Sequence, residues 1–205
     1  MFAVIFEVEP YPHRFDGYLE IARMLRPELE RIEGFIENTR YRSRARHGLL
    51  LSLSLWHDEK AVIRWRSHAG HYAAQALGRR EILARYRLRV GEVARLIEAG
   101  SEVRLPQQRF DETATGDAKA MAFVLGQAGG AIEDSPPHAM QTDVLDGVVD
   151  PVQWAALTAF RTGDDAAQYI DGQETGNRRL AVRIIRDYGL LDRREAPQFH
   201  EPVLR

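Results

Sequence analysis

The chain has no cysteine among its 205 residues. This absence excludes disulfide bonds, thiolate metal sites, cysteine-ligated iron–sulfur clusters and a cysteine nucleophile. A long hydrophobic run is also missing, because no stretch approaches the roughly 20 apolar residues of a membrane-spanning helix. The N-terminus has a short apolar run with no basic region before it, MFAVIFEVEP, which is typical of a strand and not of a signal peptide. We therefore expect a cytoplasmic protein with no membrane partner.

The chain likewise lacks an excess of charge of one sign. It has 28 Lys and Arg residues against 30 Asp and Glu residues, for a formal net charge of -2. No bulk electrostatic field therefore attracts nucleic acid, and we expect no nucleic-acid partner. The hydrophobic content of 44% is sufficient for a sizeable core in one large or two small domains.

Periodicity in the first half predicts alternating strands and helices. Strands are expected at residues 2–8, 35–42, 49–56 and 86–94, and helices at 16–32 and 58–78. Pro27 should bend or restart the first helix. The order strand, helix, strand, strand, helix, strand is that of a ferredoxin-like split β-α-β unit, with both helices on one face of an antiparallel sheet. A second copy of this unit is one structure that would cover the other face of the sheet, and the two sheets would then form a barrel.

The second half repeats this order in a weaker form. Strands are expected at residues 120–126, 142–149, 154–161 and 180–191, and a short helix at 164–173. Residues 126–140 hold too many Gly and Pro residues for a long first helix. We therefore predict an α+β protein of two tandem ferredoxin-like units: a domain at residues 1–104, a linker at 105–117 and a degenerate domain at 118–205.

One run of residues carries a family resemblance. Residues 65–79 read WRSHAGHYAAQALGR, preceded by LWHDE at 55–59 and followed by YRLRV at 86–90. This pattern resembles the antibiotic biosynthesis monooxygenase family, through residues in the first half and through element order alone in the second. The resemblance implies a dimeric α+β barrel fold and a homodimer. It leaves the function open, because some members oxygenate polyphenols without metal or flavin and others bind and cleave haem.

The residues of this run fall on different faces of the predicted helix. At 100° per residue, Trp65 and Tyr72 belong to an apolar stripe that should face the sheet. His68 and Gln75 lie on its flank, and His71 lies further round, near solvent or another subunit unless the helix is bent. An alternative interpretation is that the two aromatic residues are simply core and that the histidines occupy a partly exposed face or a dimer contact.

A pocket between helix and sheet is the functional interpretation. Cofactor-free oxygenation needs a base that ionises a phenol, a cation that holds the anion, and an apolar cavity that excludes water. His68 is the candidate base and Arg64 or Arg42 the cation. The full set of candidates comprises His68, Arg64 and Tyr72 as catalytic residues, and Trp65, Trp56, Arg42, His71 and Gln75 as substrate-binding residues.

Haem is the alternative cofactor. Haem-degrading relatives place a histidine ligand about three helical turns after such a Trp, and an Asn in the first strand; here those positions hold Gln75 and Glu7. His71 or His68 could substitute as the ligand. No zinc-binding spacing occurs, so we expect no metal.

Taken together, these patterns predict a cofactor-independent monooxygenase acting on a small aromatic or polyphenolic, quinol-like substrate with dioxygen. The alternatives are a non-catalytic ligand-binding or structural protein of the same fold, and a haem-binding or haem-degrading protein. The second half has no counterpart to the Trp-His-His run, so we expect it to be structural, closing the barrel.

Overall fold

The computed structural model describes residues 1–98, 100–127, 135–173 and 177–203. The first unit and the hairpin that follows it comprise β1 (Phe2–Pro10), η1 (Pro12–Arg14), α1 (Phe15–Glu30), β2 (Phe35–Ser43), β3 (Leu50–Trp56), α2 (Glu59–Ser67), α3 (Ala69–Leu77), η2 (Gly78–Ile82), β4 (Leu83–Glu98) and β5 (Ser101–Arg104). The second unit comprises β6 (Ala120–Gln127), β7 (Ala139–Gly147), β8 (Gln153–Phe160), α4 (Gly163–Asp171) and β9 (Arg178–Gly189).

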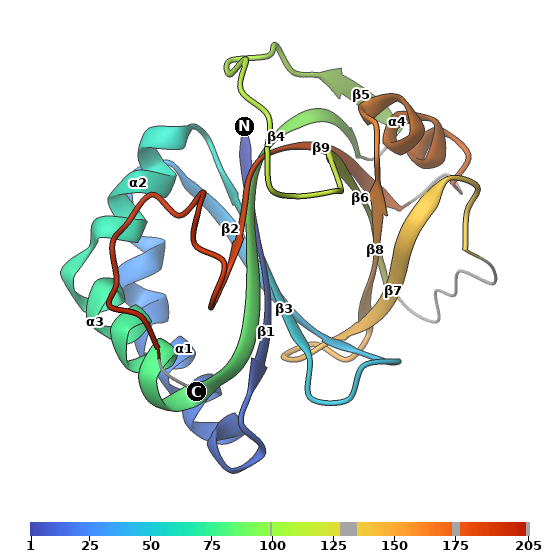
Figure 1. Cartoon of the computed structure of the whole chain (residues 1–205). Coiled ribbons are helices and arrows are strands. Elements are labelled where there is room, and N and C mark those ends of the chain that lie inside the picture. The colour runs from blue at the N-terminus through green and yellow to red at the C-terminus, as the bar shows by residue number, and fades with distance from the viewer. Residues whose placement is uncertain (99, 128–134, 174–176, 204–205) are drawn as a thin grey trace.

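The strands form one nine-stranded sheet in the order β1-β3-β2-β7-β8-β6-β9-β4-β5, and an additional pairing of β1 with β4 closes all but β5 into a barrel (Figure 1). Each unit contributes four neighbouring strands in the ferredoxin-like order, β4-β1-β3-β2 and β9-β6-β8-β7. The units join where β2 pairs with β7 and where β4 pairs with β9, both antiparallel. The predicted fold class, two tandem ferredoxin-like units forming an α+β barrel, is confirmed.

The barrel interior is a packed core to which both units contribute. Successive side chains of a strand point to opposite faces, so on β1 Ala3 and Ile5 face inward, whereas Phe2 and Val4 face the helices. Large inward side chains from β6 and β8, Phe123 among them, pack against those of β1 and β3. The second unit therefore covers the sheet face that the first unit leaves apolar, within a single chain. Pairing of two chains stays a prediction.

Buried ion pairs join the barrel strands in addition to the apolar core. Arg89 of β4 donates to Glu7 of β1 and, over 3.1 Å from Nε to Oδ2, to Asp187 of β9. Arg46 donates to Glu7 over 2.8 Å and to Asp143 of β7 over 2.6 Å. Burial alone would raise the pKa of the Glu7 carboxyl, but the charge of Arg89 and the hydrogen bonds from both guanidinium groups hold that pKa below its ordinary value. The network ties the strands of the two units together.

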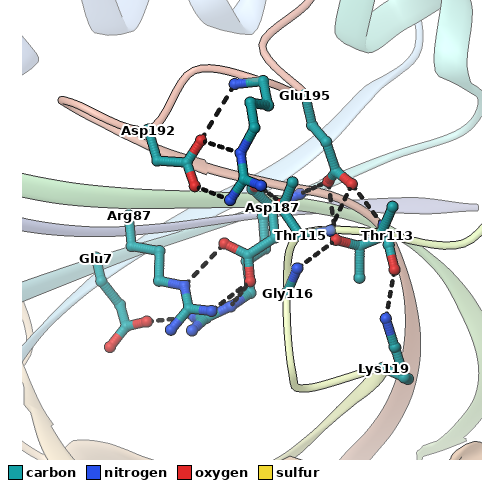
Figure 2. Close-up of polar contacts among 12 residues, drawn as sticks. Glu7, Arg87, Thr113, Thr115, Gly116, Lys119, Asp187, Asp192 and Glu195 are labelled. Atoms are coloured by element: carbon teal, nitrogen blue, oxygen red, sulfur yellow. Dashed lines mark hydrogen bonds and ion pairs between the residues drawn. The ribbon is translucent and has the colours of Figure 1, made fainter.

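The predicted linker is held against β9. The Glu195 carboxylate accepts hydrogen bonds from the Thr113 hydroxyl at 2.8 Å, from the Thr115 backbone N–H at 3.0 Å and from the Asp187 backbone N–H at 2.6 Å (Figure 2). Asp187 also receives two hydrogen bonds from Arg87, at 2.8 and 2.7 Å. One carboxylate of the C-terminal tail thus fastens the segment between the units to the last strand.

Three predicted elements differ from the structure. The single helix at 58–78 is two helices, because His68 has extended backbone angles, φ -61 and ψ 130. Pro27 does not restart the first helix, which continues to Glu30. The strand at 86–94 extends in both directions as β4, Leu83–Glu98.

The expected absence of a helix at 126–140 falls partly on residues 128–134, which lie outside the described residues. The described helices all lack the length and apolar character that a membrane-crossing helix requires.

Candidate functional site

A cavity of about 220 Å³ lies between the outer face of the first unit's sheet and the helices that cover it. The sheet contributes a largely apolar floor, which includes Val4, Phe6, Leu88 and Val90. Helices α1 and α2 contribute apolar side chains such as Leu25. This composition is typical of a small-molecule site, in which apolar walls carry a few polar groups.

The break between α2 and α3 shapes one wall of the cavity. Asp58 caps α2, and its Oδ1 accepts the Ala61 N–H at 2.8 Å. The extended backbone of His68 ends α2 and lets α3 begin in a new direction, so residues after the break leave the helical phase of residues before it. His71 consequently lines the cavity, whereas Tyr72 is 43% exposed. The expectation that Tyr72 faces the sheet is wrong. His71 is expected near solvent only if the helix is unbent, and the break at His68 removes that condition.

Trp65 and His71 form a stacked pair in this wall. Their ring centroids are 4.2 Å apart and their planes differ by 11°. Nδ1 of His71 lies 2.9 Å from the Trp65 carbonyl oxygen, which can only accept, so Nδ1 carries the proton of the neutral ring and Nε2 remains an acceptor. Burial lowers the pKa of His71 to about 4, so the imidazole is neutral at physiological pH.

Gln75 supports this pair from the next turn of α3. Its Nε2 lies 3.1 Å from Nδ1 of His71 and donates to the Arg66 carbonyl oxygen, also over 3.1 Å. The same carbonyl accepts a hydrogen bond from Gln198 Nε2 at 3.1 Å. The wall formed by α2 and α3 is therefore joined across the helix break and to the C-terminal tail.

Positive charge predominates in the cavity lining. Five arginines contribute, and Glu59 is the one acidic side chain among the described lining residues. Arg109 engages Glu59, with 2.6 Å between Nη1 and Oε2. The arginines are Arg40, Arg66, Arg79, Arg186 and Arg193. An anionic group would therefore be stabilised in this cavity.

The second half of the chain also contributes to the cavity. Arg186 and Tyr188 of β9 pair with Val90 and Leu88 of β4 and share their outward face. The C-terminal tail, coloured red, then passes over α2 and α3 (Figure 1). His200 of this tail stacks on Tyr72, with ring centroids 5.1 Å apart. The expectation of a purely structural second half needs correcting, because this half closes the barrel and also forms part of the cavity wall.

Half of the predicted site residues meet at the cavity. Of the others, Arg64 donates to the Glu33 carbonyl oxygen at 3.0 Å, and Nδ1 of His68 lies 3.4 Å from Oε2 of Glu28. Arg42 lies over the Phe15 ring, 5.4 Å from its centroid. The residues that line the cavity are Trp56, Trp65, His71 and Gln75; those absent from its lining are His68, Arg64, Tyr72 and Arg42. Their individual roles stay predictions.

Sequence reasoning missed the contributions of β9 and of the tail. The alternation of Arg186, Asp187 and Tyr188 could have shown that the first and third share a face. It could not have shown that this face lies opposite α2. Arg193 of the tail donates to the Tyr86 hydroxyl at 2.7 Å. Among the described residues, no group of three or more His, Asp or Glu side chains is arranged to hold a metal ion.

Comparisons with known proteins agree with this architecture. The family model described as antibiotic biosynthesis monooxygenase matches residues 1–77. A protein of Pyricularia oryzae named jasmonate monooxygenase ABM is 41% identical over 219 residues, covering 99% of this chain and 100% of the relative.

Solved structures are more distant. An aldoxime dehydratase in complex with butyraldoxime has a TM-score of 0.55 at 7% identity, covering 93% of this chain and 80% of that one, and shows a shared fold alone. A structure described as an antibiotic biosynthesis monooxygenase has a TM-score of 0.35 at 17% identity, covering 38% of this chain and 81% of that one.

Proposed function

Because this chain belongs to the antibiotic biosynthesis monooxygenase family, we propose that it oxygenates a small, largely apolar organic acid in the cavity beside Trp65. The observation that carries the proposal is the combination of apolar walls with an arginine-rich lining. The relative named for jasmonate supports this class, since jasmonate is a carboxylic acid with a cyclopentanone ring and an apolar chain. We infer a jasmonate-like acid as the first candidate substrate.

The cavity supplies the conditions that oxygenation needs. Apolar walls exclude water from reactive oxygen intermediates. The stacked pair of Trp65 and His71 gives one wall an aromatic surface and a neutral imidazole whose Nε2 can accept a proton or a hydrogen bond. Arginines of the lining hold the negative charge of the substrate or of an anion formed from it.

Electron balance separates two forms of the reaction. When a CH₂ group becomes a carbonyl, the substrate supplies all the electrons that convert the second oxygen atom of O₂ to water. When a C–H bond becomes C–OH, two further electrons must come from a reductant. Oxygen uptake with and without NAD(P)H or ascorbate therefore tests whether the reaction is independent of a cosubstrate.

A quinol-like phenol is the second candidate substrate. It is favoured by His71, because a neutral ring with Nδ1–H bonded to the Trp65 carbonyl presents Nε2 to a phenolic proton. His68, predicted as the base, would require a movement at the helix break to take this role, since it does not line the cavity. We therefore place His71 ahead of His68 as the base.

The test measures enzyme-dependent oxygen uptake with jasmonic acid and with a panel of hydroquinones and anthrones, and follows ¹⁸O₂ into the product by mass spectrometry. Ala74→Phe places a ring in the cavity, whereas Ala73→Phe places the same ring on an exposed position of the same helix. We expect uptake that Ala74→Phe abolishes and Ala73→Phe retains. No uptake with any compound, or equal loss in both variants, would contradict the proposal.

Haem binding and ligand binding without turnover are the alternatives. Of the two histidines predicted as substitute haem ligands, His71 lines the cavity and His68 does not, while Gln75 occupies the position expected for a histidine and donates to the Arg66 carbonyl. Added hemin should then give a Soret shift that His71→Ala removes. A shift that survives this change excludes His71 as the ligand. Saturable binding of jasmonic acid with no oxygen uptake would favour a binding protein.

A further inference from the structure

The five arginines of the cavity differ in how far their charge is already engaged. Arg79 donates to the Tyr86 hydroxyl at 2.8 Å and to the Leu190 carbonyl oxygen at 3.2 Å. Arg193 donates to the Tyr86 hydroxyl and, over 2.9 Å, to the Gln198 carbonyl oxygen. These two arginines attach the tail to the wall of the cavity, and their donors are largely occupied.

Arg66 and Arg186 have fewer hydrogen-bond partners for their guanidinium groups than Arg79 and Arg193 have. Nε of Arg66 is buried and has no hydrogen-bond partner among the described residues. The Arg186 side chain makes no hydrogen bond or ion pair with any residue in the described part of the chain. A buried donor without a partner is unfavourable, and the cavity arginines include two, Nε of Arg66 and Nε of Arg40; the half-buried Arg186 adds a guanidinium group that also has no hydrogen-bond partner within the described residues.

The nearby acidic groups do not supply the missing partner. Glu59 is engaged by Arg109, and Asp111 receives two hydrogen bonds from the same Arg109, at 2.8 and 2.6 Å. Burial is the largest effect on Arg66 and lowers its pKa; next in size, Tyr188 raises that pKa, the neighbouring charge of Arg186 lowers it, and Glu59 raises it. The two cations therefore repel each other in a space where an anion would relieve that repulsion.

We propose that Arg66 of α2 and Arg186 of β9 form the subsite that binds the carboxylate of the substrate, an inference that rests on the proposed function. A carboxylate has two oxygens that match the donor geometry of a guanidinium group, and charged hydrogen bonds of this kind are strong. Tyr188, which lines the cavity and pairs with Leu88 in the register that places Arg186 beside Val90, adds a hydroxyl donor. Burial raises the pKa of this phenol to about 12, so it keeps its proton.

This subsite also fixes the orientation of the ligand. Arg66 follows Trp65 directly in α2, and its carbonyl oxygen accepts a hydrogen bond from Gln75, which lies one turn after His71 in α3. A ligand held by its carboxylate at Arg66 would lay its apolar body along the sheet floor, next to the Trp65–His71 pair. The second unit, through Arg186, would thus contribute to substrate selection as well as to the cavity wall.

The experiment compares binding of jasmonic acid with that of its methyl ester, which has the same apolar body and no charge. Tryptophan fluorescence is a direct readout, because Trp56 and Trp65 line the cavity. Arg66→Met and Arg186→Met should each weaken binding of the acid about tenfold or more, and should change binding of the ester less than about twofold. Arg23→Met, which removes an exposed positive charge from α1, should leave both affinities unchanged.

Several outcomes overturn the subsite. They are equal effects on acid and ester, no effect of either substitution, and no binding of the acid by the wild-type protein. A loss confined to Arg40→Met, which alters another cavity arginine with an unpartnered buried Nε, would also overturn it by moving the anion to β2. Thermal melting of each variant shows whether the fold is retained. Acid-specific binding that needs Arg66 and Arg186, without oxygen uptake, supports the subsite and contradicts only the oxygenase function.

Discussion

Arg46, in the turn between β2 and β3, holds Asp143 of β7 through two hydrogen bonds, 3.0 Å from Nε and 2.6 Å from Nη2 to the same carboxylate oxygen, Oδ2. The two residues are far apart in sequence and belong to different units. Asp143 is almost fully buried, with a side-chain exposure of 3%, and Ser43 donates to its other oxygen at 2.8 Å. The seam between the units at this point, where β2 pairs with β7, therefore depends on the buried Asp143 charge as well as on strand pairing.

Replacing this carboxylate should weaken the seam. Asp143→Ala removes the acceptor that Arg46 and Ser43 share. Arg46 keeps its bond to Glu7 and is 36% exposed, so we expect a loss of about 2 kcal/mol of the free energy of unfolding, below that of a fully buried pair. The matched control is Asp146→Ala, three residues later on the same strand, whose partner Arg44 and own carboxylate are 39% and 48% exposed. We expect the control to cost less than about 1 kcal/mol. Urea denaturation measures both values, and similar losses would contradict a special role for Asp143.

His71 should make stability depend on pH. Its pKa is about 4 in the folded protein, because burial disfavours the charged ring, whereas the ordinary value is 6.5. Between these values the unfolded chain binds more protons, so the free energy of unfolding falls as the pH is lowered from about 6.5 to about 4. The His71 contribution is fully present above pH 6.5 and amounts to at most about 3 kcal/mol.

The measurement is urea denaturation at about pH 7 and about pH 5 for the wild type and for His71→Gln. The variant should lose less stability on acidification than the wild type, since Gln does not titrate. His57→Gln, at an exposed position before α2, should retain the wild-type pH dependence. If both variants lose as much stability on acidification as the wild type does, the His71 imidazole is not held neutral by burial.

Gly91 lies at the other seam between the units, where β4 pairs with β9. A Cβ atom at this position would lie 2.4 Å from the Arg183 carbonyl oxygen and 2.6 Å from Val182 Cγ1, where the register of β4 and β9 shifts. Gly91→Ala should therefore lower the free energy of unfolding by about 1 to 3 kcal/mol. Gly17→Ala, within α1 and with no atom within 4 Å of the added Cβ, should be neutral or stabilising by up to about 1 kcal/mol. Thermal denaturation distinguishes the two, and equal melting temperatures would show that the seam can open at no cost.

The sequence was sufficient for the architecture because strand and helix periodicities repeat in the same order in both halves. It was also sufficient to select Trp56, Trp65, His71 and Gln75 as candidate site residues, and these four line the cavity. It could not reveal the break at His68, where no proline interrupts the pattern and the angles are set by packing. The contribution of Arg186 was equally inaccessible, because it depends on which β4 residues lie beside β9.

The C-terminal tail should control access to the cavity. Gln198 donates to the Arg66 carbonyl oxygen at 3.1 Å, and His200 stacks on Tyr72, so the described residues from 197 onward attach to both α2 and α3. Deleting the chain from residue 197 onward leaves Glu195 in place to hold the linker, and leaves Arg193 in place at Tyr86. The deletion should therefore change the cavity more than the barrel.

We expect the truncated protein to retain nearly the wild-type melting temperature but to bind jasmonic acid more weakly, with faster dissociation in stopped-flow fluorescence. The reason is that an opened cavity admits water and loses the Gln198 and His200 side chains from its lining. Phe199→Ser is the matched control, because this side chain is 80% exposed within the same segment and does not line the cavity. An unchanged dissociation rate in the truncated protein would show that the tail packs on the helices without closing the site.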